Sequence, residues 1–87
     1  MTIIQKELAR HALGLTKQKR SYRNHFVAGP GHSDYVHWLV MVEQGDAHRR
    51  PGTEISGGDD IFWLTEAGAK LALNPGEKLD PEDFPNA

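Results

Sequence analysis

Apolar residues close to the N-terminus recur at the spacing of one helix face. The stripe consists of Ile4, Leu8, Ala12 and Leu15, together with His11. Intervals of three and four residues predict an amphipathic helix over residues 2–15. Thr2 stands just before the stripe and is a suitable N-cap, because its hydroxyl can accept a hydrogen bond from a free backbone N–H. We expect the stripe to face the core and Lys6, Glu7 and Arg10 to face solvent.

A second and more apolar stripe predicts a helix over residues 34–44. It consists of Tyr35, Trp38, Leu39 and Val42, and it is widened by Val36, Val40 and Met41. Ser33 or Asp34 can cap its N-terminus, and Gly45 occupies the position where helices commonly end in a left-handed glycine. Because apolar side chains cover most of its circumference, we expect this helix to be largely buried.

Two short runs typical of strands follow, with a turn-rich loop between them. Residues 47–50 and 61–64 predict the strands, and the Pro-Gly and Gly-Gly pairs within residues 51–60 predict a hairpin loop. Thr65 then caps a last helix, which ends before an Asn-Pro-Gly sequence. Residues 22–28 form too short a pattern to distinguish a helix from an extended segment.

Together these elements predict a small α+β domain with three to four helices and a two-stranded β-hairpin. We expect residues 1–74 to form a single domain. Residues 75–87 hold three of the five prolines and four acidic residues, so we expect an acidic, Pro-rich and flexible C-terminal tail. The expected core consists of Leu8, Leu15, Trp38, Leu39, Val42, Ile61, Leu64 and Leu71.

Composition and charge narrow the functional classes. The 87 residues include no cysteine, which excludes disulfides and thiolate metal sites. No apolar run approaches the roughly 18 residues that cross a bilayer, so we expect a soluble, cytoplasmic protein. Residues 1–26 carry a net charge of +5, whereas residues 27–87 carry −7. This split indicates either a basic face that meets a polyanion or a solvated helix end that pairs with the acidic half.

The second half of the chain resembles the corresponding part of winged-helix regulators. The matching segments are Trp38-Leu39, Val42-Glu43-Gln44-Gly45, His48-Arg49-Arg50, Ile61-Phe62-Trp63-Leu64-Thr65-Glu66-Ala67-Gly68 and Leu71. The resemblance implies that residues 34–44 occupy the recognition-helix position and that residues 51–60 form a wing. The chain departs from a DNA-binding winged helix in three respects. It has one clear helix before that position instead of two, no Lys or Arg within residues 34–44, and an acidic wing.

The whole chain also resembles small uncharacterised proteins of tailed phages and prophages. The resembling segments are Arg10-His11-Ala12-Leu13-Gly14-Leu15, Tyr22-Arg23-Asn24-His25-Phe26, Gly29-Pro30-Gly31, Gly57-Gly58-Asp59 and Leu64-Thr65-Glu66-Ala67-Gly68. The resemblance implies a phage or prophage origin and a bacterial host cell. It implies no particular activity.

Four cations and one aromatic residue fall close together in residues 17–23. They are Lys17, Lys19, Arg20 and Arg23, with Tyr22 among them. Such a mixture can bind a phosphate backbone and stack a base. The same composition also suits a solvated connector between helices. The first functional hypothesis is therefore a non-enzymatic, nucleic-acid-associated regulatory module that uses these four cations.

A protein-binding surface is the alternative. Phe62 and Trp63 point to opposite faces of their strand, so only one ring can enter the core. The other is exposed, or is covered by Leu79 and Phe84 of the tail. Charged residues around an exposed ring would make the rim of an interface. The rim consists of Glu54, Asp59 and Asp60. This reading predicts a module for virion assembly, for inhibition of a host system or for self-association.

The sequence offers weak evidence for a metal site or for catalysis. The candidate ligands are His25, His32, His37 and His48. Of these, His32 and His37 form the one pair with the spacing of zinc ligands, and no cysteine supports it. Ser33 and Asp34 lie beside these histidines, but helix capping explains both. We therefore predict no metal, no cofactor and no enzymatic activity.

Overall fold

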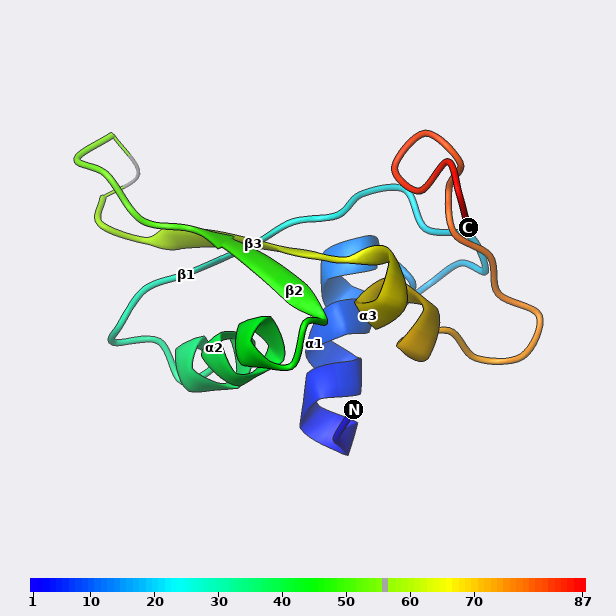
Figure 1. Ribbon diagram of the computed structural model, residues 1–87, viewed down its shortest axis with the longest axis horizontal. Helices are drawn as coiled ribbons and strands as arrows, with labels where there is room; N and C mark the ends of the chain where they lie inside the picture. The colour runs from blue at the N-terminus through cyan, green and yellow to red at the C-terminus, as the bar shows by residue number, and fades with distance from the viewer. Residues whose placement is uncertain (56) are drawn as a thin grey trace.

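Helices and strands are interspersed along the chain in the computed structural model, which describes residues 1–55 and 57–87 (Figure 1). The elements are α1 (Ile3–Leu13), β1 (Phe26–Ala28), α2 (Tyr35–Glu43), β2 (Ala47–Arg50), β3 (Asp60–Leu64) and α3 (Glu66–Leu71). The predicted α+β class is confirmed. The described residues form three helices and one three-stranded antiparallel sheet in place of the expected two-stranded hairpin.

The additional strand is β1, which lies within residues 22–28, the segment whose conformation could not be predicted from the sequence. The strand order is β1-β3-β2, so β3 lies between the two others. Phe26 pairs with Phe62, and Arg49 pairs with Phe62 from the other side. Beyond β1, the side chain of Asn24 continues the pairing: its amide donates to the Leu64 carbonyl at 3.1 Å and accepts from the Leu64 N–H at 2.8 Å. β3 therefore finds partners on both edges.

α1 begins after its predicted cap, but it ends two residues earlier than predicted and buries a different face. Thr2 and Gln5 form a capping box, and Gly14 at φ +78° ends the helix. The buried residues of the helix are Gln5, Ala9, Ala12 and Leu13. Ile4 and His11, expected in the core, are exposed, and Leu8 is half-buried. Small residues at the buried face let α2, α3 and β3 pack closely against this helix. This close packing, and not the size of the apolar residues beside them, decides which face of α1 is buried.

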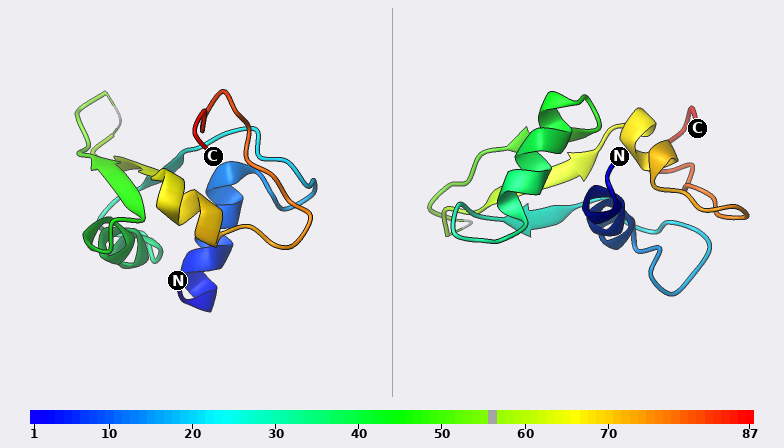
Figure 2. Two further views of the ribbon diagram at one scale, coloured as in Figure 1. Left: turned by 45° about the vertical axis from the view of Figure 1, so that its right-hand side comes forward. Right: turned by 90° about the horizontal axis from the view of Figure 1, so that it is seen from below.

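α2 lies under one face of the sheet and places Trp38 at the centre of the core (Figure 2). The indole packs against the rings of Phe26 and Phe62, with centroids 5.2 and 5.5 Å away. The expectation that this helix is largely buried is wrong. Val36 and Val40 remain 58% and 39% exposed, because the sheet and α1 cover only one side of the helix.

The core also takes in residues that the sequence assigned elsewhere. Leu15, Trp38 and Leu64 are buried as predicted, whereas Leu71 is 51% exposed and α3 instead buries Ala69. Further buried residues are Leu13, Met41, Phe62, Leu79 and Phe84. The last two belong to the segment that was expected to form a flexible tail.

Residues 75–87 run along the outside of the connector between α1 and β1 (Figures 1 and 2). Leu79 and Phe84 bury their side chains in the core, and Glu77 forms an ion pair with Arg10 of α1. Two apolar anchors and one ion pair thus attach a segment whose composition is otherwise that of a disordered chain.

Candidate nucleic-acid interface

The connector from α1 to β1 is fixed by backbone hydrogen bonds to the end of α1 and to the C-terminal segment. Tyr22 N–H donates to the Leu13 carbonyl at 3.1 Å, which ties the connector to the end of α1. Ser21 N–H donates to the Lys78 carbonyl at 3.0 Å, and Lys78 N–H donates to the Lys19 carbonyl at 2.8 Å. The buried Ser21 hydroxyl also accepts from the Asp80 N–H at 2.7 Å. The basic segment is therefore held against the C-terminal segment.

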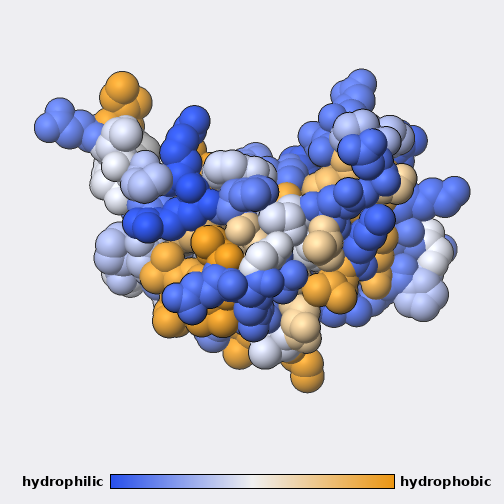
Figure 3. All heavy atoms as spheres, in the orientation of Figure 1, coloured by the Kyte–Doolittle hydropathy of each residue, from blue (hydrophilic) through white to orange (hydrophobic). Residues whose placement is uncertain are grey.

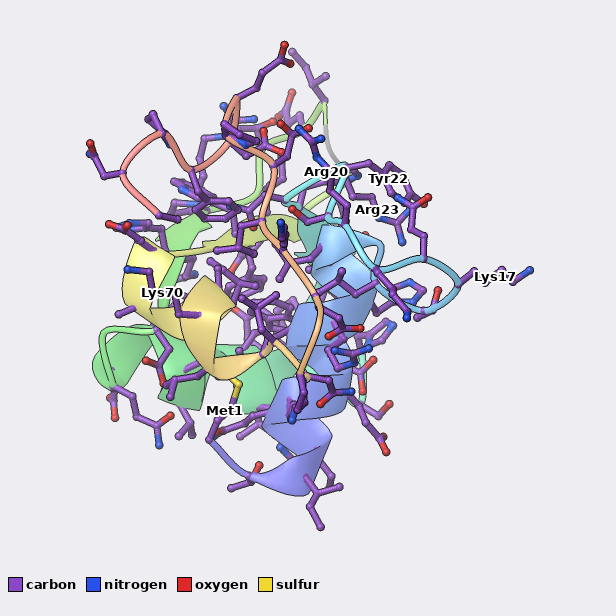
Figure 4. All side chains as sticks on the ribbon, turned by 90° about the vertical axis from the view of Figure 1, so that its right-hand side faces the viewer. Met1, Lys17, Arg20, Tyr22, Arg23 and Lys70 are labelled. Atoms are coloured by element: carbon purple, nitrogen blue, oxygen red, sulfur yellow. The ribbon has the colours of Figure 1, made fainter. Side chains whose placement is uncertain are left out.

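This pairing adds a fifth cation to the four that the sequence singled out. Lys78 lies opposite Arg20 in a parallel bridge, and its side chain is exposed, as are those of Lys17, Lys19 and Arg20. The basic surface is defined here as Lys17, Lys19, Arg20, Arg23 and Lys78. Arg20, Tyr22 and Arg23 lie near one another, whereas Lys17 projects outward from the connector (Figure 4). Nothing in the local sequence around Lys78 marks it as a partner of the connector.

Two of the five cations are partly engaged within the protein. The Arg20 guanidinium lies 3.5 Å from the Asp80 carboxylate, and both side chains are partly exposed. Arg23 donates from Nε and Nη2 to the His11 carbonyl at 3.2 and 2.7 Å, so it helps to cap the C-terminus of α1. Lys17, Lys19 and Lys78 have no ion pair among the interactions of the described residues.

A shallow groove of about 460 Å³ opens beside Tyr22. It is lined by Gln18, Lys19, Arg20, Ser21, Tyr22, Gly76, Lys78 and Asp80. The Tyr22 ring is 57% exposed, and the Arg23 guanidinium carbon lies 5.3 Å from the ring centroid. The groove therefore combines an aromatic wall with cations from two segments of the chain.

An ion pair between Arg10 and Glu77 fixes the C-terminal segment just before Lys78. Arg10 Nη2 donates to Glu77 Oε2 at 2.7 Å, and Arg10 Nη1 also contacts the same carboxylate. The hydrogen bonds from Arg10 lower the pKa of Glu77 to about 2, and the Asn74 N–H adds to this shift. Arg10, expected on the solvent side of α1, is half-buried and holds the segment that carries Lys78.

The hairpin end of the molecule uses its charge internally. Asp60 is only 4% exposed, and its carboxylate accepts from Tyr35 Oη at 2.7 Å, from Arg49 Nε at 2.6 Å and from Gly52 N–H at 2.7 Å. These hydrogen bonds, that of Tyr35 first, lower the pKa of Asp60, and the same contact raises the pKa of Tyr35. Asp60 is thus buried inside the hairpin and cannot serve in the surface rim where the sequence placed it.

The other residues of the predicted protein-binding surface do not come together. Glu54 and Asp59 are exposed near the tip of the hairpin, whereas Phe62 is fully buried against Trp38. Trp63 is half-buried, packs on His48 at a centroid distance of 5.3 Å and borders a hollow beside the C-terminal segment. Four residues of extended chain span about 13 Å, which separates Trp63 from the acidic tip.

The described residues also bear on metal binding and on membrane insertion. Across residues 1–55 and 57–87, no group of three or more His, Cys, Asp or Glu side chains is arranged to hold a metal ion. Within the same residues, no helix has the length and apolar character needed to cross a membrane.

Comparisons of the chain with protein-family models, with curated proteins and with solved structures found no match.

Proposed function

We propose that this chain is a non-enzymatic binding module of phage or prophage origin whose basic surface binds a nucleic-acid backbone in a regulatory role. The observation that carries the proposal is the pairing of the connector with residues 76–80. It places Lys78 beside Lys19 and Arg20, although the chain as a whole has a net charge of −2. Cations gathered on one face of an acidic protein create a local field that attracts phosphates.

The order of elements is consistent with a winged-helix arrangement, which we include in the proposal. α1, β1, α2, β2 and β3 follow one another, and the strands associate in the order β1-β3-β2. In this arrangement α2 would be the recognition helix, and it presents Val36, Val40 and Glu43 on its exposed side. Phosphate contacts need cations, so α2 is poorly suited to a DNA groove. The proposed contact therefore lies on the connector and not on α2.

Salt dependence tests the proposal directly. We expect the chain to bind an oligonucleotide of random sequence at low salt, measured by fluorescence anisotropy. Four phosphate contacts give a slope of about −3 to −4 in a plot of log affinity against log salt. Replacing Lys17, Lys19 and Lys78 together by Gln should flatten the slope by about 2 to 3.

Lys70→Gln is the matched control, because Lys70 lies on α3 on the other side of the molecule in Figure 4 and pairs with Glu66. This variant should keep the wild-type slope. Absence of binding at low salt, or an unchanged slope in the triple variant, would overturn the proposal.

A protein partner is the second candidate, and one observation at the hairpin tip favours it. Ile55 is completely exposed next to Glu54, and Asp59 is exposed nearby. An apolar side chain within an acidic rim is typical of an interface anchor. This candidate keeps the acidic loop of the sequence hypothesis but replaces the aromatic anchor with Ile55. Loss of a co-purifying host or virion protein in Ile55→Ser, with unchanged stability, would support it.

A further inference from the structure

The Tyr22 ring is held in a fixed position by the end of α1. Gly14 has φ +78°, and a Cβ atom built on it would lie 2.2 Å from Cε1 of Tyr22. The ring therefore lies directly on the glycine backbone, in a place that no other residue at position 14 would leave free. The Tyr22 backbone is also bonded to the Leu13 carbonyl at 3.1 Å. A ring that is already fixed loses little conformational entropy when it binds a ligand.

Despite this contact, most of the ring remains open to solvent. Tyr22 is 57% exposed although the Arg23 guanidinium lies over its ring, 5.3 Å from the ring centroid, so a stacked base would share or take the place of this contact. The adjoining groove of about 460 Å³ is within the range of small-ligand sites, about 300–1,000 Å³. Gly76 lines it and adds no side chain that would fill the space.

The charges around the groove favour an anion at its rim. Asp80 is the one carboxylate in its lining, and that carboxylate is engaged by Arg20 at 3.5 Å and by the Glu82 N–H at 3.0 Å. Lys19 and Lys78 remain available on the same lining, and the backbone bond between them keeps their main chains adjacent. The phosphates of a bound strand would thus meet two neighbouring lysines.

The geometry points to a single-stranded nucleic acid as the ligand, with one unpaired base stacked on Tyr22 in this groove and the flanking phosphates on Lys19 and Lys78. This inference rests on the proposed function and specifies its substrate. A base inside a duplex is stacked between its neighbours, so only an unpaired base can offer its face to an aromatic ring. The lack of Lys and Arg on α2 agrees with a single strand, because groove reading of a duplex would need a different surface.

Three probes of equal length separate base stacking from backbone binding: a single-stranded DNA oligonucleotide, the same backbone made abasic, and a duplex. We expect the single strand with bases to bind at least about tenfold more tightly than the abasic strand. Alanine at a stacking position typically weakens binding about 5- to 150-fold. Tyr22→Ala should show a loss of this size on the base-containing strand and none on the abasic strand. Tyr22→Phe should retain wild-type affinity.

Tyr22→Trp provides a second readout that does not depend on the stability of the alanine variant. Its added indole emission should be quenched by the base-containing strand and left unchanged by the abasic strand. Equal affinity for the two strands, or tighter binding of the duplex, would overturn the inference while leaving the proposed function in place. Absence of salt-dependent binding to all three probes would overturn both.

Discussion

The two ends of the molecule use their basic residues in different ways. At the hairpin end, Arg49 is bonded to the buried carboxylate of Asp60, which also fixes Tyr35 and the start of the loop at Gly52. The connector and the C-terminal segment lie towards the opposite end of the longest axis (Figure 1). There the exposed Lys19 and Lys78 are joined by a backbone hydrogen bond. Arg49 is thus engaged by a buried carboxylate, whereas Lys19 and Lys78 have no ion pair among the described residues.

The hydropathy of the surface agrees with this division. Polar and charged side chains dominate the face over the connector and C-terminal segment, whereas hydrophobic side chains gather over α2 (Figure 3). The surface proposed to bind a polyanion is thus distinct from the exposed surface of α2.

Removing the carboxylate at the hairpin end should have the largest effect on stability. Asp60→Ala leaves three donors without their acceptor, and an unsatisfied buried polar group costs about 1–3 kcal/mol. We expect a clear decrease in the free energy of unfolding, measured by chemical denaturation. Glu54→Ala, at an exposed position of the same hairpin, should have little effect. A wild-type midpoint for Asp60→Ala would show that this network does not hold the hairpin.

Acid should weaken the attachment of the C-terminal segment through Glu77. Its pKa is lowered from 4.5 to about 2 by Arg10, so the stabilisation is fully present above pH 4.5 and is lost as the pH falls towards 2. Glu77→Gln should therefore be less stable than the wild type near neutral pH, and the difference should vanish at low pH. The comparison of the two proteins cancels the parallel titration of Asp60. A pH-independent difference would contradict this assignment.

A pair of single substitutions separates the structural cation from the ligand-binding cation. Arg49→Gln should lower the denaturation midpoint and leave the salt slope of nucleic-acid binding unchanged. Lys78→Gln should leave the midpoint unchanged and reduce the slope by about 0.7 to 0.9. If both variants change the same property, the two ends do not have separate roles.

Lys70→Gln should have the smallest effect. Its ammonium lies 3.4 Å from Glu66 in an exposed i,i+4 pair, which is typically worth about 0.3–0.5 kcal/mol. We expect a change close to the error of a denaturation experiment and no change in binding. A large loss of either property would show that α3 contributes to the site.

Features that depend on neighbouring residues could be predicted from the sequence. Thr2 and Thr65 cap their helices, Gly45 adopts φ +81° after α2, and β2 spans the residues predicted for it. Phe62 and Trp63 lie on opposite faces of β3, as strand alternation requires, whereas the sequence left open which of the two rings enters the core. Caps, glycine turns and alternation act over a few residues, so they are visible in a single sequence.

Features that depend on contacts between segments far apart in the sequence became visible only in the folded chain. Whether Phe26 belongs to a strand depends on Phe62, and whether Asp60 is buried depends on Tyr35 and Arg49. The helix face that α1 buries likewise depends on how closely α2 and α3 can approach it. These are choices between alternatives that local propensity leaves nearly equal in energy.

The candidate site combines residues that are adjacent in the sequence with one that only folding brings to them. The connector cations could be read from the sequence, because they are adjacent. Lys78 could not be recognised in this way, because its position beside Arg20 depends on contacts between segments far apart in the sequence. One of these contacts is the hydrogen bond that the Asp80 N–H donates to Ser21 Oγ, across 59 residues. Leu79 and Phe84 supply the apolar burial that offsets the entropy of ordering a proline-rich, acidic segment. The cations of the connector are thus visible in the sequence, whereas packing of the C-terminal segment decides the surface of which they form part.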